Sequence, residues 1–254
     1  MPSKRKIQGF ARRAADATSG DWGQIRGYNN ALKRLAKRRV KKLARTGNFE
    51  ISQIAMQVAA LQHALLHRIV SLGTAITRNW NAGNVLGAAL GARALLETIA
   101  LIHRVEDELF SFAEKKDFEG LQKHAVKLIF ANRDDELNAQ NPELQATNAL
   151  TYVQHFDKAV PGIEKHYKFL CEWCHPNHFG HYGAFAKFDK EANSFLFCEQ
   201  KMHGPEMLDA ILAVYSMLNP LEETMDRWDK TILKASQVRS EPTPPPSPQK
   251  DAAG

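Results

Sequence analysis

Residues 50–72 have the sequence EISQIAMQVAALQHALLHRIVSL, in which aliphatic side chains recur at helical spacing. The recurring residues are Ile51, Ile54, Val58, Leu61, Leu65, Ile69 and Leu72. Because an α-helix has about 3.6 residues per turn, steps of three and four place all of them on one face. The stretch therefore predicts a long amphipathic helix that buries one side in a helical bundle.

Similar spacing recurs along most of the chain. It predicts further helices over residues 30–46, 84–114, 117–137, 142–161, 162–174 and 205–235. Asn219-Pro220 predicts a kink in the last of these helices, because proline lacks the N–H that a helix interior needs. Two short apolar runs, 184–188 and 194–198, predict a small β-hairpin. We therefore expect an all-α helical bundle with a small β-hairpin insertion.

Gly83, Gly87 and Gly91 follow one another at intervals of four residues, at the start of the most apolar predicted helix. Glycine lowers helix propensity by about 1 kcal/mol relative to alanine. A row of glycines in a helix is therefore typical of a close approach to a neighbouring helix. We expect residues 84–114 to lie at the centre of the bundle.

Positive charge is concentrated near the N-terminus. Residues 1–50 contain 14 Lys and Arg against 3 Asp and Glu; since the whole chain carries +6, the other 204 residues carry −5. We predict three parts: a basic N-terminal helical arm over residues 1–48, a helical bundle domain over 49–235, and a disordered proline-rich tail over 236–254. The tail offers a segment that a protein partner could bind.

The composition favours a cytoplasmic protein. No stretch approaches the roughly 20 apolar residues of a membrane span, and no apolar segment follows the first basic residues as in a signal peptide. Three cysteines are typical of reduced thiols and not of a disulfide framework. We expect no association with a membrane, whereas the sequence leaves homo-oligomerisation open.

The predicted helix over residues 30–46 combines a thin apolar stripe with many cations. The cations are Lys33, Arg34, Lys37, Arg38, Arg39, Lys41 and Lys42. Such a row attracts nucleic acid, because neutralising phosphates releases counterions. No base-reading motif accompanies it, so we expect binding to the phosphate backbone of RNA or DNA. The alternative is that these side chains pack against the acidic remainder of the chain.

Arg93 and Glu97 are four residues apart on an otherwise apolar helix. Side chains at this spacing meet, and charges in apolar surroundings need a partner. One interpretation is a structural ion pair that fixes the register of the helix. The other is a polar pocket in the bundle that binds an anion or supports His175.

A group of thiols and imidazoles begins at the end of the predicted helix 162–174. The group consists of Cys171, Cys174, His178, His181 and Cys198. These ligand types suit zinc, although cysteines near a helix end are also common core residues. Residues 171–175 also match the C-x-x-C-H pattern of haem attachment, but without the export signal that this chemistry needs. His63 and His67 lie one turn apart and lack further ligands. We expect no cofactor, with zinc as the alternative.

Two segments together resemble a bacterial helical family of unknown function. They are Ala92–Glu97 and Tyr167–Pro176, and members of the family pair an R-x-x-x-E helix with a tyrosine-led helix that ends in a histidine. The likeness covers about residues 55–235 and is similar in outline to HEPN-type helical domains, many of which are ribonucleases in toxin–antitoxin and phage-defence systems. The resemblance implies roles for Arg93, Glu97, Tyr167 and His175. The closely spaced arginine and histidine of HEPN catalysis are absent from this sequence.

We therefore expect a nucleic-acid-associated protein, of the kind found in defence systems. The basic helix would bind phosphate, and Arg93, Glu97 and His175 would form a polar pocket. One alternative is a hydrolase or nuclease that uses these three residues with Tyr167, or that uses the zinc site. The other alternative is a protein-interaction scaffold that uses the bundle surface and the tail.

Overall fold

The computed structural model describes residues 7–12, 22–197 and 204–238, which form a helical bundle with one short β-hairpin. The helices are α2 (Trp22–Arg38), α3 (Asn48–Ile51), α4 (Gln53–Asn81), α5 (Val85–Glu114), α6 (Phe118–Phe130), α7 (Asp135–Gln140), η1 (Pro142–Leu144), α8 (Ala149–Ala159), α9 (Ile163–Cys174), η2 (His178–Gly183), α10 (Pro205–Ser216) and α11 (Leu218–Ser236). The predicted class, an all-α bundle with a small hairpin, is confirmed. Most of the predicted tail, from residue 239 onward, lies outside the described residues.

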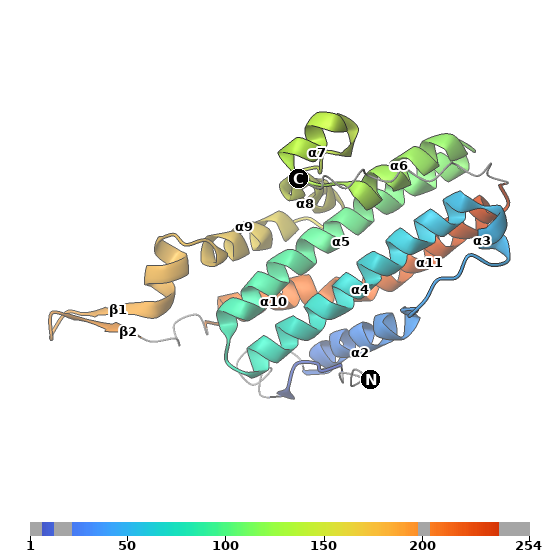
Figure 1. The fold of residues 1–254 in the computed structure, drawn as a ribbon. Helices are drawn as coiled ribbons and strands as arrows, with labels where there is room; N and C mark the ends of the chain where they lie inside the picture. The colour runs from blue at the N-terminus through green and yellow to red at the C-terminus, as the bar shows by residue number, and fades with distance from the viewer. Residues whose placement is uncertain (1–6, 13–21, 198–203, 239–254) are drawn as a thin grey trace, which may run out of the picture.

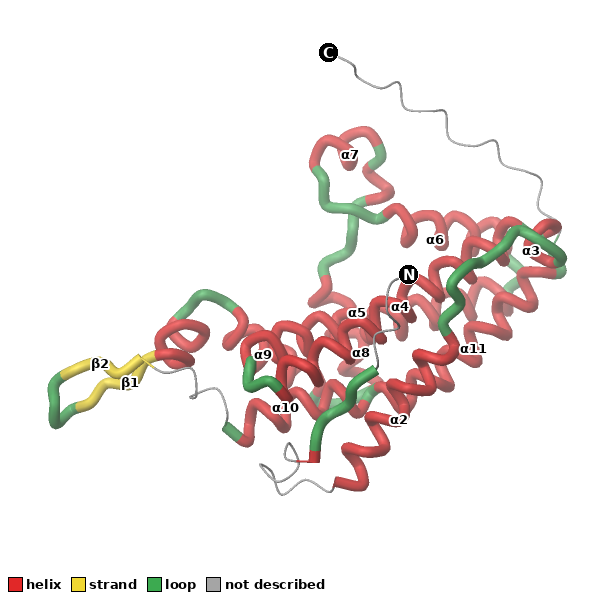
Figure 2. Tube along the Cα trace, turned by 60° about the horizontal axis from the view of Figure 1, so that its bottom comes forward, coloured by secondary structure: helices red, strands yellow, loops and turns green. Residues whose placement is uncertain are grey.

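Helix α5 is at the centre of the bundle. It contacts α4, α6, α8, α9, α10 and α11. Figure 1 shows α4, α5 and α11 as long helices running side by side, with α2 along the outer edge. The antiparallel strands β1 (Ala186–Asp189) and β2 (Ser194–Phe197) project beyond α9 at one end of the molecule, as Figure 2 also shows.

Local features of the sequence explain where α4 and α5 begin and how the chain turns between them. The Ser52 hydroxyl accepts a hydrogen bond from the Ala55 amide at the start of α4, and the Asn84 side chain caps α5 in the same way. Gly83 makes the turn between them with a φ of 82°. A Cβ atom at Gly91 would lie 2.9 Å from Cγ1 of Ile76. The predicted close approach to a neighbouring helix is thus present at Gly91.

Helix α2 belongs to the bundle and buries Ile25, Ala31, Leu32 and Leu35 against it. The predicted range, 30–46, is wrong at both ends. The helix begins earlier because Ile25 and Asn29 are buried and hold its first turns in place despite two nearby glycines. It ends at Arg38 because the following residues carry closely spaced like charges and no buried apolar stripe.

Several other predicted boundaries are also wrong. Helix α4 continues past residue 72 to Asn81, because its apolar face stays buried as far as Trp80. The range 142–161 holds the 3-10 helix η1 and then α8, which Asn148 caps. Between the predicted helix 162–174 and the predicted hairpin, His178–Gly183 form the π-helix η2. The last predicted helix divides at Met217 into α10 and α11, close to the kink expected at Pro220.

The N-terminal segment 7–12 is tied to this framework. The Phe10 amide donates to Asn29 Oδ1, and Asn29 Nδ2 donates back to the Phe10 carbonyl. Phe10 is buried and its ring meets Tyr215 edge-on, with the ring centroids 4.9 Å apart. This segment therefore fixes the first half of α2 against α4 and α10.

Helix α5 is long and apolar enough, by length and composition, to cross a membrane. However, 56% of its most apolar window is buried inside the bundle. Burial of this kind is compatible with the core helix of a soluble protein.

We predict that Leu35→Ala lowers the free energy of unfolding by about 2–5 kcal/mol, because Leu35 is fully buried under α2. Urea unfolding followed by circular dichroism measures this loss. Lys33→Ala on the exposed side of α2 is the control and should change the stability by less than about 0.5 kcal/mol. Equal effects of the two variants would mean that α2 does not pack on the bundle.

Candidate functional site

The bundle brings together three of the four predicted catalytic residues, Arg93, Glu97 and Tyr167. Arg93 and Glu97 lie on α5, and Arg93 Nε is 3.2 Å from Glu97 Oε1. The same carboxylate oxygen accepts a hydrogen bond of 3.0 Å from the Tyr167 hydroxyl on α9. The Arg93 guanidinium also lies 5.9 Å from the centroid of the Tyr167 ring. Glu97 thus joins the two helices.

The phenol of Tyr167 is held in its protonated form. Burial raises the pKa of Tyr167, and the hydrogen bond to Glu97 raises it further, to about 12. At neutral pH the hydroxyl therefore donates its proton to the carboxylate and does not act as a base. This arrangement positions the two side chains and favours a stabilising role.

Cys171 and Cys174 continue the same side of α9 toward its C-terminus. Both thiols are partly buried. Burial raises the pKa of each thiol, although the nearby charge of Arg93 opposes it, and that of Cys174 reaches about 11. Because the thiolate is the reactive form of cysteine, these surroundings disfavour a nucleophilic role for either residue at neutral pH.

His175 does not join this cluster. It caps the C-terminus of α9 with an extended backbone, and its amide donates to the Cys171 carbonyl. Its side chain is exposed, and no contact in the described part of the chain links its imidazole to Arg93, Glu97 or Tyr167. The expected polar pocket therefore consists of Arg93, Glu97 and Tyr167 without His175.

The segment after His175 folds back tightly on the end of α9. Asn177 Oδ1 accepts a hydrogen bond from the Gly180 amide, and Asn177 Nδ2 donates to Glu172. A Cβ atom at Gly180 would collide with the His175 carbonyl oxygen. Glycine is thus required there for close backbone approach.

The predicted zinc ligands are only partly covered by the structure, because Cys198 lies outside the described residues. The other four, Cys171, Cys174, His178 and His181, do not bring three ligand atoms within 4.8 Å of one another. The other histidine pair considered in the sequence, His63 and His67, lies on α4. His67 Nε2 is 2.9 Å from the Val40 carbonyl oxygen, so this imidazole joins α4 to the segment after α2.

One group of three metal-ligating side chains does occur in the described ranges, and it was not predicted. It consists of His103, Asp107 and His155. The i, i+4 spacing of His103 and Asp107 on α5 was a signal in the sequence. Nothing in the sequence indicated that His155 of α8 would join them.

The seven predicted cationic residues divide into two sets. Arg34 binds Glu222 at 2.7 Å, and Arg38 binds Asp226 and Asp229, both at 2.6 Å. These three carboxylates are on α11, so Arg34 and Arg38 fasten α2 to the bundle. The other set is Lys33, Lys37, Arg39, Lys41 and Lys42, and no ion pair with a described residue involves any of them. Arg39 is half-buried and its Nε donates to the Ala36 carbonyl.

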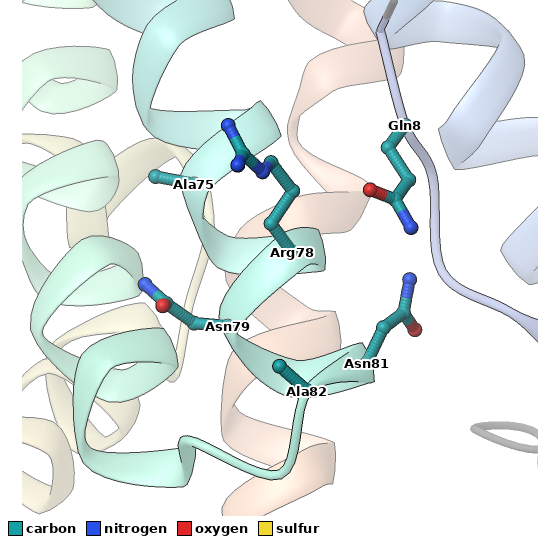
Figure 3. Close-up of a pocket in the computed structure, with 6 residues that line it drawn as sticks. All are labelled: Gln8, Ala75, Arg78, Asn79, Asn81 and Ala82. Carbon is teal, nitrogen blue, oxygen red and sulfur yellow. The ribbon is translucent and has the colours of Figure 1, made fainter.

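A separate depression of about 520 Å³ lies at the C-terminal end of α4 (Figure 3). It is lined by Gln8, Ala75, Arg78, Asn79, Asn81 and Ala82. Among the described residues that line it, Arg78 is the only charged one, and none of them belongs to the Arg93 cluster.

The chain matches no protein-family model, and it has no significant match among curated proteins or solved structures. The resemblance to HEPN-like helical families thus remains a prediction from the sequence.

We predict that Tyr167→Phe changes the dependence of stability on pH. The folded phenol has a pKa of about 12 against 10.0 in the unfolded chain, so the folded state keeps a proton that the unfolded state loses. The contribution of Tyr167 to stability is full below pH 10.0 and is lost as the pH rises toward about 12. Urea unfolding should show that part of this alkaline loss is absent in the variant.

At neutral pH the same variant should lose about 1–2 kcal/mol, because a half-buried carboxylate loses a hydrogen bond. Tyr152→Phe, which removes a hydroxyl of α8, serves as control. An alkaline stability profile of Tyr167→Phe identical to that of the wild type would contradict the assigned contact.

Proposed function

We propose that the chain is a cytoplasmic nucleic-acid-associated protein that binds phosphate backbone through the basic strip. We define the basic strip as Lys33 and Lys37 of α2 with Lys41 and Lys42 of the following segment. The observation that supports this proposal is that the carboxylates of α11 pair with the two arginines and leave the four lysines unpaired among the described residues. Two arginines neutralise acidic side chains and hold α2, and the four lysines are exposed.

The basic strip has the properties that sequence-independent phosphate binding requires. Its four ammonium groups have no carboxylate within ion-pair distance among the described residues, so their charge is available to a polyanion. Two of the four lysines, Lys33 and Lys37, are carried by a packed helix, which lowers the conformational entropy lost on binding. No aromatic side chain lies within residues 29–48 to stack on bases, so the expected contacts are to phosphates.

The cluster of Arg93, Glu97 and Tyr167 supports a binding protein better than a hydrolase. Its carboxylate is engaged by two partners, its phenol is protonated at neutral pH, and the exposed His175 is not part of it. General acid–base catalysis would need a group whose pKa lies near the working pH. In this proposal the cluster ties α9 to α5, and a role in defence rests on the family resemblance alone.

We predict that replacing the four lysines of the basic strip by glutamate lowers affinity for nucleic acid at least tenfold at about 0.1 M salt. Fluorescence anisotropy with a labelled single-stranded RNA and a labelled duplex DNA measures the dissociation constants. On duplex DNA the slope of log K against log salt should become shallower by roughly 0.9 for each phosphate that the variant no longer neutralises.

The matched control carries the same charge change at scattered exposed lysines. These are Lys115, Lys165, Lys190 and Lys230. If this control weakens binding as much as the strip variant, net charge and not the strip determines affinity. Unchanged binding by the strip variant would reject the proposal.

A second candidate function, self-association, is favoured by the apolar surface of the hairpin region. The exposed side chains are Phe179, Tyr182, Phe188, Phe195, Leu196 and Phe197. Phe197 alone is 82% exposed. Exposed apolar side chains in mutual contact, here the rings of Tyr182, Phe188 and Phe195, are typical of a protein-binding surface. A two-stranded hairpin also has outer edges that can pair with a strand of a second copy.

We predict that Leu196→Ser combined with Phe197→Ser weakens self-association of the wild-type chain. Sedimentation velocity over a range of concentrations should show a dimer of the wild type and mostly the 28.5 kDa monomer of the variant. Leu233→Ser, at an exposed apolar position on α11, is the control. A wild-type protein that stays monomeric at every concentration would exclude this function.

A further inference from the structure

Three side chains from two helices converge beside the centre of the bundle, away from both the basic strip and the Arg93 cluster. His103 and Asp107 are one turn apart on α5, and His155 comes from α8. Asp107 Oδ2 lies 3.5 Å from His103 Nδ1 and 3.1 Å from His155 Nε2. All three ligand atoms are within 4.8 Å of one another.

The geometry of this group matches the ligand shell of a small transition-metal ion. Bonds of about 2.0–2.1 Å in a tetrahedral arrangement separate neighbouring ligand atoms by roughly 3.3 Å. Two of the three separations, 3.5 and 3.1 Å, are already close to that value.

The His103 side chain has an unsatisfied buried nitrogen. Its Nδ1 atom is inaccessible to solvent and forms no hydrogen bond with a described residue, although the Asp107 carboxylate lies 3.5 Å away. A buried polar atom without a partner destabilises the folded state. The ring is held in position by Phe156, with the two ring centroids 5.1 Å apart. A metal ion between His103 and Asp107 would satisfy this nitrogen.

An ion could reach the group from solvent. The Asp107 side chain is 46% exposed. His155 lines a cavity of about 540 Å³ between α5, α6 and α8. Within that cavity Arg104 and His124 both contact Glu108, at 2.6 and 2.7 Å. Burial raises the pKa of Glu108, but these two partners outweigh it and the pKa is lowered, so this carboxylate already has hydrogen-bonding partners of its own.

We propose that His103, Asp107 and His155 bind one divalent transition-metal ion, with the remaining coordination position open to water from the adjacent cavity. Two imidazoles and one carboxylate are a donor set that suits zinc or ferrous iron. Binding there would join α8 to α5 and stabilise the folded state by mass action. The site is independent of the nucleic-acid proposal, because it shares no residue with the basic strip.

Titration of the tag-free, metal-depleted full chain with Co²⁺ and Zn²⁺ tests the proposal. Visible absorption of cobalt reports its coordination, and calorimetry gives the zinc stoichiometry and affinity. We expect one site per chain, without the charge-transfer band of a cobalt–thiolate bond. Asp107→Asn and His155→Gln should each weaken zinc binding at least tenfold, and zinc should raise the melting temperature of the wild type more than that of either variant.

Control variants separate this site from its two rivals. His67→Gln alters the histidine pair of α4, and Cys171→Ser with Cys174→Ser alters the thiols of α9. Both controls should bind zinc like the wild type. The proposal is overturned by the absence of stoichiometric binding, by a thiolate band, or by loss of binding in a control while Asp107→Asn still binds.

Discussion

The burial of helix α5 is the constraint on which the rest of the structure depends. Helices α4, α6, α8, α9, α10 and α11 contact it, and the acidic side chains of Glu97 and Glu106 each meet a partner from another helix. Glu97 accepts from Tyr167 of α9, and Glu106, which is almost fully buried, receives two hydrogen bonds from Arg227 of α11. Removing one partner of such a partly buried contact costs about 1–3 kcal/mol. These contacts therefore fix the register of the helices around α5 as well as stabilising it.

Helix α2 is also held by a combination of apolar burial and ion pairs. Its apolar stripe anchors it, and two arginines pair with a row of carboxylates on α11. Since that row pairs with Arg34 and Arg38, the four lysines of the basic strip are left exposed and without an ion pair to a described residue. This segregation of charge creates a cationic surface, in which Lys33 and Lys37 are carried by the packed helix and Lys41 and Lys42 by the segment after it. The mode of nucleic-acid binding that we propose is a direct consequence of this segregation.

Local signals in the sequence were sufficient for part of the fold. Helices α5 and α9 lie almost where predicted, because Asn84 and the proline after His175 mark their ends clearly. The ends of α2 were not predictable from local pattern, because tertiary burial of Ile25 and Asn29 outweighs two glycines.

Arg93, Glu97 and Tyr167 do meet as expected. His175 does not, because the backbone turns to an extended conformation at that residue. The group of His103, Asp107 and His155 depends on how α8 packs against α5, which no spacing within either helix reveals.

Hydrogen exchange of the backbone amides of α2 in the free, full-length protein tests the central claim most directly. The account requires α2 to be a packed part of the bundle that presents its lysines from a fixed frame. Amides from Ile25 to Leu35 should therefore exchange slowly, with protection comparable to that of the middle of α4. Exchange of these amides at the rate of an unfolded chain, while α4 remains protected, would contradict the account.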